Sequence, residues 1–111
     1  NLAVWLQRMA AAEGARPALY LGRKQVADYA GFHARAAAVA GWLRGQGLQP
    51  GDRVGIFMKN CPDYLIALYG IWYAGAAAVP VNAKLHINEF RYILENSDSR
   101  IAFAKLSWRT S

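Results

Sequence analysis

The second half of the chain alternates short apolar runs with longer helix-forming stretches. Arg53–Met58 is almost continuously apolar after its first residue, a pattern typical of a strand covered on both faces. Cys61–Ala74 is predicted to be a helix, with Asn60 as its N-cap and Pro62 in its first turn, where the missing N–H is not needed. Ala76–Val81 is another short apolar run and predicts a second strand buried on both faces.

The alternation continues to the end of the chain. A third helix is predicted over His86–Asn96, and a final strand over Arg100–Ala104. Strand, helix, strand, helix and strand with short links are typical of parallel strands joined by helical crossovers. The sequence therefore predicts an α/β fold in which this βαβαβ unit follows the elements of the first half.

The first half of the chain begins with an amphipathic helix. Leu2–Glu13 carries its apolar residues at helical spacing, and Gly14 ends it. Ala18–Leu21 and Gln25–Ala27 flank the turn residues 22–24 and predict a short β-hairpin. The apolar positions of the first helix are Leu2, Trp5, Leu6 and Met9.

A second, longer helix follows the hairpin. Asp28 is its predicted N-cap, and the helix ends at residues 45–47, where two glycines occur. Gln49–Asp52 is predicted to be a turn, because Pro50 presets φ at the second position and Gly51 accepts a positive φ at the third. One stripe of the helix is apolar and consists of Phe32, Ala36, Val39, Ala40 and Leu43.

Composition favours one folded unit with unusually apolar surface. The 111 residues are 55% hydrophobic and 18% charged, which excludes a disordered chain and gives one core at most. This apolar content exceeds what a chain of this length readily buries. We therefore expect exposed apolar surface and marginal stability, with self-association of the isolated chain.

A stretch without charge, residues 64–83, is as long as a membrane-spanning helix. Gly75 and Pro80 interrupt it, and the run of alanines between them adds little hydrophobicity. A helix followed by a strand is the better interpretation, and no transmembrane segment is predicted.

The charge is basic but dispersed. Thirteen Lys and Arg against seven Asp and Glu give a net charge of +6, and only Arg23 and Lys24 are adjacent. A nucleic-acid footprint needs cations clustered on one face, so no nucleic-acid partner is predicted. A peripheral protein that touches anionic lipid through its Arg and Lys side chains stays open as a further reading.

Residues with catalytic chemistry are few, and we assign none of them a catalytic, cofactor-binding or metal-binding role. His86 and Glu89 share a helical face, but one pair does not make a metal site. Cys61 is the only cysteine, which excludes an internal disulfide and favours a reducing, cytoplasmic location. His33 is expected at the surface or in packing, Glu95 in solvent and Asp98 in a turn. A core role is expected for the aromatic residues of the predicted helix, with the lining of a ligand cavity as the alternative; they are Tyr64, Tyr69, Trp72 and Tyr73.

Three strings in the second half carry a family resemblance: residues 51–56 (GDRVGI), 60–64 (NCPDY) and 74–82 (AGAAAVPVN). Together they resemble the N-terminal part of adenylate-forming enzymes, such as acyl-CoA synthetases, peptide-synthetase adenylation domains and luciferases. Residues 28–32 (DYAGF) and 89–94 (EFRYIL) are similar to further elements of that family. The sequence departs from the family pattern at Asp28, Gly31 and His86.

The resemblance implies a fragment, residues 1–111, of an ATP-dependent fatty acid or other acyl-CoA synthetase that also uses magnesium and coenzyme A. In this family the phosphate loop, the acyl pocket and the catalytic lysine follow the matched region. We therefore expect the chain alone to bind no cofactor and to be inactive, with the remainder of the parent chain as its partner. The alternative is a stand-alone α/β interaction module without enzymatic activity.

Overall fold

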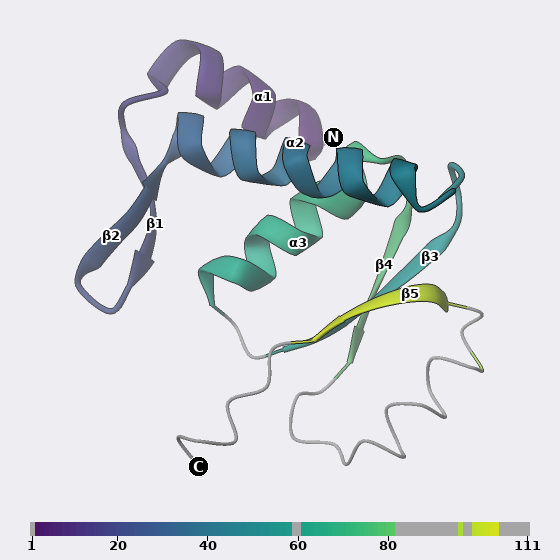
Figure 1. The fold of residues 1–111 in the computed structure, drawn as a ribbon. Helices are drawn as coiled ribbons and strands as arrows, with labels where there is room; N and C mark the ends of the chain where they lie inside the picture. Colours follow the sequence, from purple (N-terminus) through teal and green to yellow (C-terminus); the bar gives the residue numbers. More distant parts are fainter. Residues whose placement is uncertain (1, 59–60, 82–95, 97–98, 105–111) are drawn as a thin grey trace.

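The computed structural model describes residues 2–58, 61–81, 96 and 99–104. A helix, α1 (Leu2–Glu13), precedes a hairpin of β1 (Pro17–Leu21) and β2 (Lys24–Asp28), and a long helix, α2 (Tyr29–Gly45), follows. Then come β3 (Arg53–Phe57), α3 (Pro62–Tyr73), β4 (Ala77–Val81) and β5 (Ser99–Ala104). In Figure 1, α1 and α2 lie side by side, and α3 crosses beneath α2 between the hairpin and the sheet.

The predicted α/β fold is confirmed. The described strands form a two-stranded antiparallel hairpin and a three-stranded sheet of order β4-β3-β5. Both pairings in the larger sheet are parallel, with β3 in the centre. The predicted helix His86–Asn96 lies outside the described residues except for Asn96, which is helical.

The predicted start and end of α2 are confirmed. Asp28 is extended and its Oδ1 accepts a hydrogen bond of 2.7 Å from the N–H of Gly31, so the carboxylate satisfies a free amide of the first turn. The helix ends at Gly45, and Gly47 has a φ of 86° just beyond it. Phe32, Ala36, Ala40 and Leu43 of the predicted stripe are buried, and Val39 is half-buried.

The turn before β3 also has the predicted geometry. Gly51 has a φ of 89°, and the N–H of Asp52 donates to the carbonyl of Gln49 at 3.0 Å. The chain thus reverses at Pro50 and enters β3, where Val54, Gly55, Ile56 and Phe57 are all buried as predicted.

The prediction of Asn60 as the N-cap of α3 is wrong. The N-cap is Cys61, which is extended and makes no side-chain capping hydrogen bond, and Pro62 follows it in the first turn. Proline fits the first helical position, because its ring presets a helical φ and it needs no N–H partner there. The helix therefore begins at the proline, one residue later than expected; Asn60 itself lies outside the described residues.

The burial predicted for the strand Ala76–Val81 is corrected, and the apolar positions of α1 are only partly buried. Of Leu2, Trp5, Leu6 and Met9, only Leu6 is buried, because α1 covers α2 along a narrow line that includes Ala3. In β4 only Val81 is buried, and Ala77 and Pro80 are exposed. Among the described strands β4 pairs only with β3, and an edge strand accommodates a proline because it needs fewer amide donors.

Residues 64–83 do not form one long helix. Their first part lies in α3 and their second in β4, separated by Gly75, which has a φ of 79°. Within the described part of the chain, no helix has both the length and the apolar character needed to cross a membrane.

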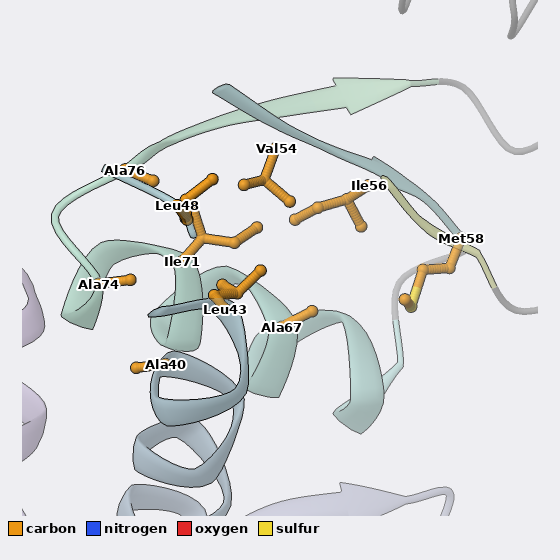
Figure 2. Packing of buried hydrophobic residues seen from close by; sticks show 10 residues of the cluster. All are labelled: Ala40, Leu43, Leu48, Val54, Ile56, Met58, Ala67, Ile71, Ala74 and Ala76. Carbon is orange, nitrogen blue, oxygen red and sulfur yellow. The ribbon is translucent and has the colours of Figure 1, made fainter. Parts of the chain in front are cut away.

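Two hydrophobic cores flank the contact between α2 and α3. The sheet-side core fills the space between these helices and β3; Figure 2 shows Val54 and Ile56 facing Leu43, Ala67 and Ile71. The hairpin-side core joins α1, the hairpin and the other face of α3. Its buried members are Leu6, Leu19, Ala27, Phe32, Ala36, Ile66 and Tyr69.

Helix α3 contributes to both cores, and α2 packs tightly against it. Gly70 of α3 marks the point of closest approach: a Cβ atom there would lie 2.5 Å from Cγ1 of Val39 and 3.0 Å from the carbonyl oxygen of Ala36. Glycine is therefore required by the spacing of the two helices.

Candidate functional site

The carboxyl ends of the parallel strands define the first candidate site. Phe57 of β3 is paired with Val81 of β4 and with Ala104 of β5, so the three strands end at the same level. In open α/β sheets, ligands bind outside the carboxyl ends of the strands. The residues that continue from these ends, 59–60, 82–95 and 105–111, lie outside the described part of the chain.

The aromatic residues of α3 form a packed cluster. Tyr69 is buried in the hairpin-side core, with ring centroids 5.1 Å from Phe32 and 5.1 Å from Trp72. Trp5 of α1 packs edge-on against Tyr29 at 5.9 Å. The expected core role is confirmed for Tyr69, whereas Tyr64, Trp72 and Tyr73 are only half-buried.

Two side chains of α2, His33 and Arg44, form hydrogen bonds with Tyr73 of α3. His33 Nδ1 and the Tyr73 hydroxyl are 2.8 Å apart, with ring centroids at 5.4 Å and an angle of 64° between the rings. Arg44 Nη2 donates to the carbonyl oxygen of Tyr73 at 2.9 Å. The predicted packing role of His33 fits this geometry, because its partner is a phenol on a neighbouring helix.

Burial raises the pKa of two tyrosine hydroxyls in this region. Desolvation, followed by the nearby Tyr29, raises the pKa of Tyr69 above its usual value of 10.0. Desolvation, followed by Tyr69, raises the pKa of Tyr73 in the same way. A protonated Tyr73 hydroxyl can donate to His33 Nδ1, so the pair joins the two helices at neutral pH.

An apolar hollow lies between the hairpin and the N-terminus of α3. It has a volume of about 460 Å³. Cys61, a free and half-buried thiol, is part of its wall. Local sequence patterns do not predict this hollow, because its two walls come from residues 18–20 and 61–65, far apart along the chain. The lining residues are Ala18, Leu19, Tyr20, Cys61, Pro62, Tyr64 and Leu65.

The described residues do not fit a metal ion. In residues 2–58, 61–81, 96 and 99–104, no three His, Cys, Asp or Glu side chains lie close enough together to bind one. His86 and Glu89, the pair considered from the sequence, lie outside the described residues. The described part of the chain thus supplies a framework and two candidate surfaces. One is at the carboxyl ends of the parallel strands, and the other is the hollow.

Comparison with known proteins decides the family. Residues 6–111 match the model of the family described as AMP-binding enzyme. The chain belongs to this family. The resemblance seen in the sequence is confirmed, and the chain corresponds to the N-terminal part of adenylate-forming CoA ligases.

Two curated members of the AMP-binding family illustrate the relationship. The chain is 39% identical over 70 residues to 3-oxocholest-4-en-26-oate–CoA ligase of Rhodococcus rhodochrous. This alignment covers 63% of this chain and 13% of the relative. The chain is also 33% identical over 74 residues to crotonobetaine/carnitine–CoA ligase of Citrobacter koseri. That alignment covers 67% of this chain and 14% of the relative. The matched segments therefore span about one seventh of the length of these two relatives.

Solved structures of AMP-binding enzymes have the same fold. The N-terminal domain of FACL13 from Mycobacterium tuberculosis is 31% identical and superposes with a TM-score of 0.83, covering 92% of this chain and 26% of that one. A benzoate CoA ligase from Burkholderia xenovorans LB400 is 27% identical with a TM-score of 0.85, covering 94% of this chain and 21% of that one. The hairpin, the helices and the parallel sheet thus correspond to about a quarter or a fifth of these larger structures.

Proposed function

We propose that the natural protein containing this chain is an ATP-dependent acyl-CoA synthetase. The observation that carries the proposal is the match to AMP-binding enzymes over residues 6–111, together with relatives that are themselves CoA ligases. In the first step a carboxylate oxygen attacks the α-phosphorus of ATP, and pyrophosphate leaves. In the second step the thiolate of coenzyme A attacks the acyl carbonyl, and AMP leaves.

The role of this chain in that reaction is to support the site, without contributing a catalytic residue. The pairing of β3 with β4 and β5 keeps the carboxyl ends of the three strands side by side. The sheet-side core packs β3 against α2 and α3. ATP, magnesium and coenzyme A are proposed to bind to later parts of the natural protein, as the resemblance to the family implies. The isolated chain neither binds ATP tightly nor turns over.

The substrate proposed is a fatty acid or another apolar carboxylic acid, in the cytoplasm. Support comes from the names of the relatives, which include CoA ligases for a cholestenoate and for benzoate. A further relative is an indigoidine synthase of Streptomyces lavendulae, 35% identical over 71 residues. Amino acids are included in the substrate panel as the competing class, because the sequence also resembles peptide-synthetase adenylation domains.

The test compares the natural gene product with the 111-residue chain. Each is incubated with ATP, magnesium, coenzyme A and one acid from a panel of fatty, aromatic and amino acids; pyrophosphate release and acyl-CoA mass are measured. We expect the natural product to form acyl-CoA from apolar acids and the chain alone to form none. Adenylation without acyl-CoA would contradict the proposed thiol acceptor, and turnover by the chain alone would contradict its supporting role.

The remainder of the protein is also the proposed partner for apolar surface on this chain. The exposed large apolar side chains that the remainder is proposed to cover lie on α1, α2 and α3, and are Leu2, Val4, Trp5, Trp42 and Leu65. Sedimentation velocity of the isolated chain at increasing concentration tests the expected self-association. A monomer at all concentrations, with a high melting temperature, would contradict this part of the proposal.

A further inference from the structure

The tip of the β1–β2 hairpin extends away from the helices (Figure 1). Leu21 pairs with Lys24, so the turn consists of Gly22 and Arg23 alone, one residue shorter than the sequence suggested. Gly22 has a φ of 64°, which glycine adopts without strain and which allows the chain to reverse tightly. We call residues 20–24 the hairpin tip.

Two large apolar side chains of the hairpin tip are in solvent. Leu21 is 62% exposed and Tyr20 is 51% exposed, whereas Leu19, one residue earlier in the same strand, is buried. Tyr20 and Leu21 together form a small apolar surface at this projecting point. Tyrosine is well suited to the boundary between water and hydrocarbon, because its ring is apolar and its hydroxyl is polar.

The charged residues along the hairpin sequence are all positive up to the end of the second strand. Arg23 and Lys24 are exposed at the turn, and Arg16 is exposed just before β1. Residues 14–27 contain no Asp or Glu. The next carboxylate, Asp28, is occupied in capping α2 through its contact with the N–H of Gly31. The hairpin tip therefore presents apolar and cationic groups together.

We propose that the hairpin tip docks on the surface of an anionic lipid membrane. Leu21 and the ring of Tyr20 enter the boundary below the lipid headgroups, and Arg23 and Lys24 contact the phosphates. The occupant follows from charge complementarity, because a cationic tip on a chain of net charge +6 is attracted to an anionic surface. Two copies meeting through their hairpin tips would instead bring like charges together. The proposal does not depend on the ligase activity.

The experiment measures binding of the natural gene product to lipid vesicles by co-sedimentation. Vesicles of phosphatidylcholine alone are compared with vesicles that also contain phosphatidylglycerol, at low and high salt. We expect binding to the anionic vesicles that weakens as salt rises, because salt screens the attraction. The double variant Arg23→Gln, Lys24→Gln removes both charges of the tip. It is expected to weaken binding about 30-fold, which corresponds to about fivefold for each cation.

A matched control removes the same charge elsewhere. Arg8→Gln and Arg35→Gln alter two exposed cations on α1 and α2. This control pair is expected to lose only a few-fold in binding. Leu21→Ser, which keeps the charge, is expected to lose about tenfold with little change in the salt dependence. Circular dichroism of each variant checks that the fold is retained, which the exposure of all these side chains favours.

Three results of the vesicle assay, or a fourth from sedimentation velocity, would overturn the proposal. The first is that the natural gene product does not bind anionic vesicles. The second is that the control pair of substitutions weakens binding as much as the tip pair. The third is that neutral vesicles bind the protein as well as anionic ones. Sedimentation velocity is run on the same samples. If Leu21→Ser dissociates a dimer and leaves vesicle binding unchanged, the hairpin tip is an interface between two copies, and the membrane proposal is wrong.

Discussion

The contact between α2 and α3 and the hairpin tip are both rich in apolar side chains, but they use them in opposite ways. At the helix contact, small residues bring two backbones so close that Gly70 has no room for a Cβ atom. At the hairpin tip, Tyr20 and Leu21 stand in solvent beside two cations. Apolar content alone therefore does not indicate a core in this chain, and the neighbours of each residue decide its role.

Two leucines give the largest expected difference between these regions. Leu43 is fully buried in the sheet-side core, and Leu43→Ala is expected to lower the free energy of unfolding by about 3 kcal/mol. Leu21 is 62% exposed, and Leu21→Ala is expected to change it by less than about 0.5 kcal/mol. Urea titration followed by circular dichroism measures both; equal losses would show that the hairpin tip is packed.

Two helical glycines give the next effect, with opposite signs. Gly70→Ala forces a methyl group against Val39 and the backbone of Ala36, and is expected to cost about 2 kcal/mol. Gly41→Ala, in α2, meets nothing within 4 Å. It is expected to stabilise the chain by about 1 kcal/mol, because alanine loses less backbone entropy in a helix. A stabilising Gly70→Ala in the same urea titrations would mean that the two helices are further apart than described.

The joint between the hairpin and α2 should respond more weakly. Asp28→Ala removes the acceptor for the N–H of Gly31 and is expected to cost about 1 kcal/mol. Asp28→Asn keeps an oxygen at the same place and serves as the matched control, with most of the stability retained. Thermal unfolding of the two variants side by side checks this; identical losses would assign the effect to charge and not to capping.

The smallest effect is expected at the His33–Tyr73 pair. Tyr73→Phe removes one hydrogen bond at the edge of the helix contact, at a cost of about 0.5 kcal/mol. The pKa of Tyr73 and of Tyr69 is raised in the folded chain, so the unfolded chain loses these protons first. The contribution of the two protonated tyrosines to the free energy of unfolding is complete below pH 10.0. It declines as the pH rises through the raised pKa values of the folded chain. Tyr73→Phe should decline less steeply in urea titrations at increasing pH; an unchanged slope would contradict this.

Local patterns in the sequence predicted most of the described elements. The stripe through α2, the proline and glycine before β3 and the Asp28 cap each act over a few residues, so their physical causes can be read directly from the sequence. The N-cap of α3 was misplaced because Asn60 has the better capping side chain, while the geometry of Pro62 placed the start one residue later.

Features that depend on distant parts of the chain could not be predicted. The exposure of β4 follows from its place at the edge of the described sheet, which the apolar run Ala76–Val81 does not reveal. The hollow beside Cys61 needs the hairpin and α3 to meet, and their residues are far apart in sequence. No catalytic residue was predicted, and the residues that follow the strand ends lie outside the described part of the chain.

Because α3 places Ile66 and Tyr69 in one core and Ala67 and Ile71 in the other, it is a wall shared by both. Neither half of the chain can open without exposing a face of this helix. Amide hydrogens of α3 should accordingly exchange only when the whole chain unfolds, as a single cooperative unit. A protease that cuts within α3 would therefore disassemble the hairpin side and the sheet side together, and would release no stable half.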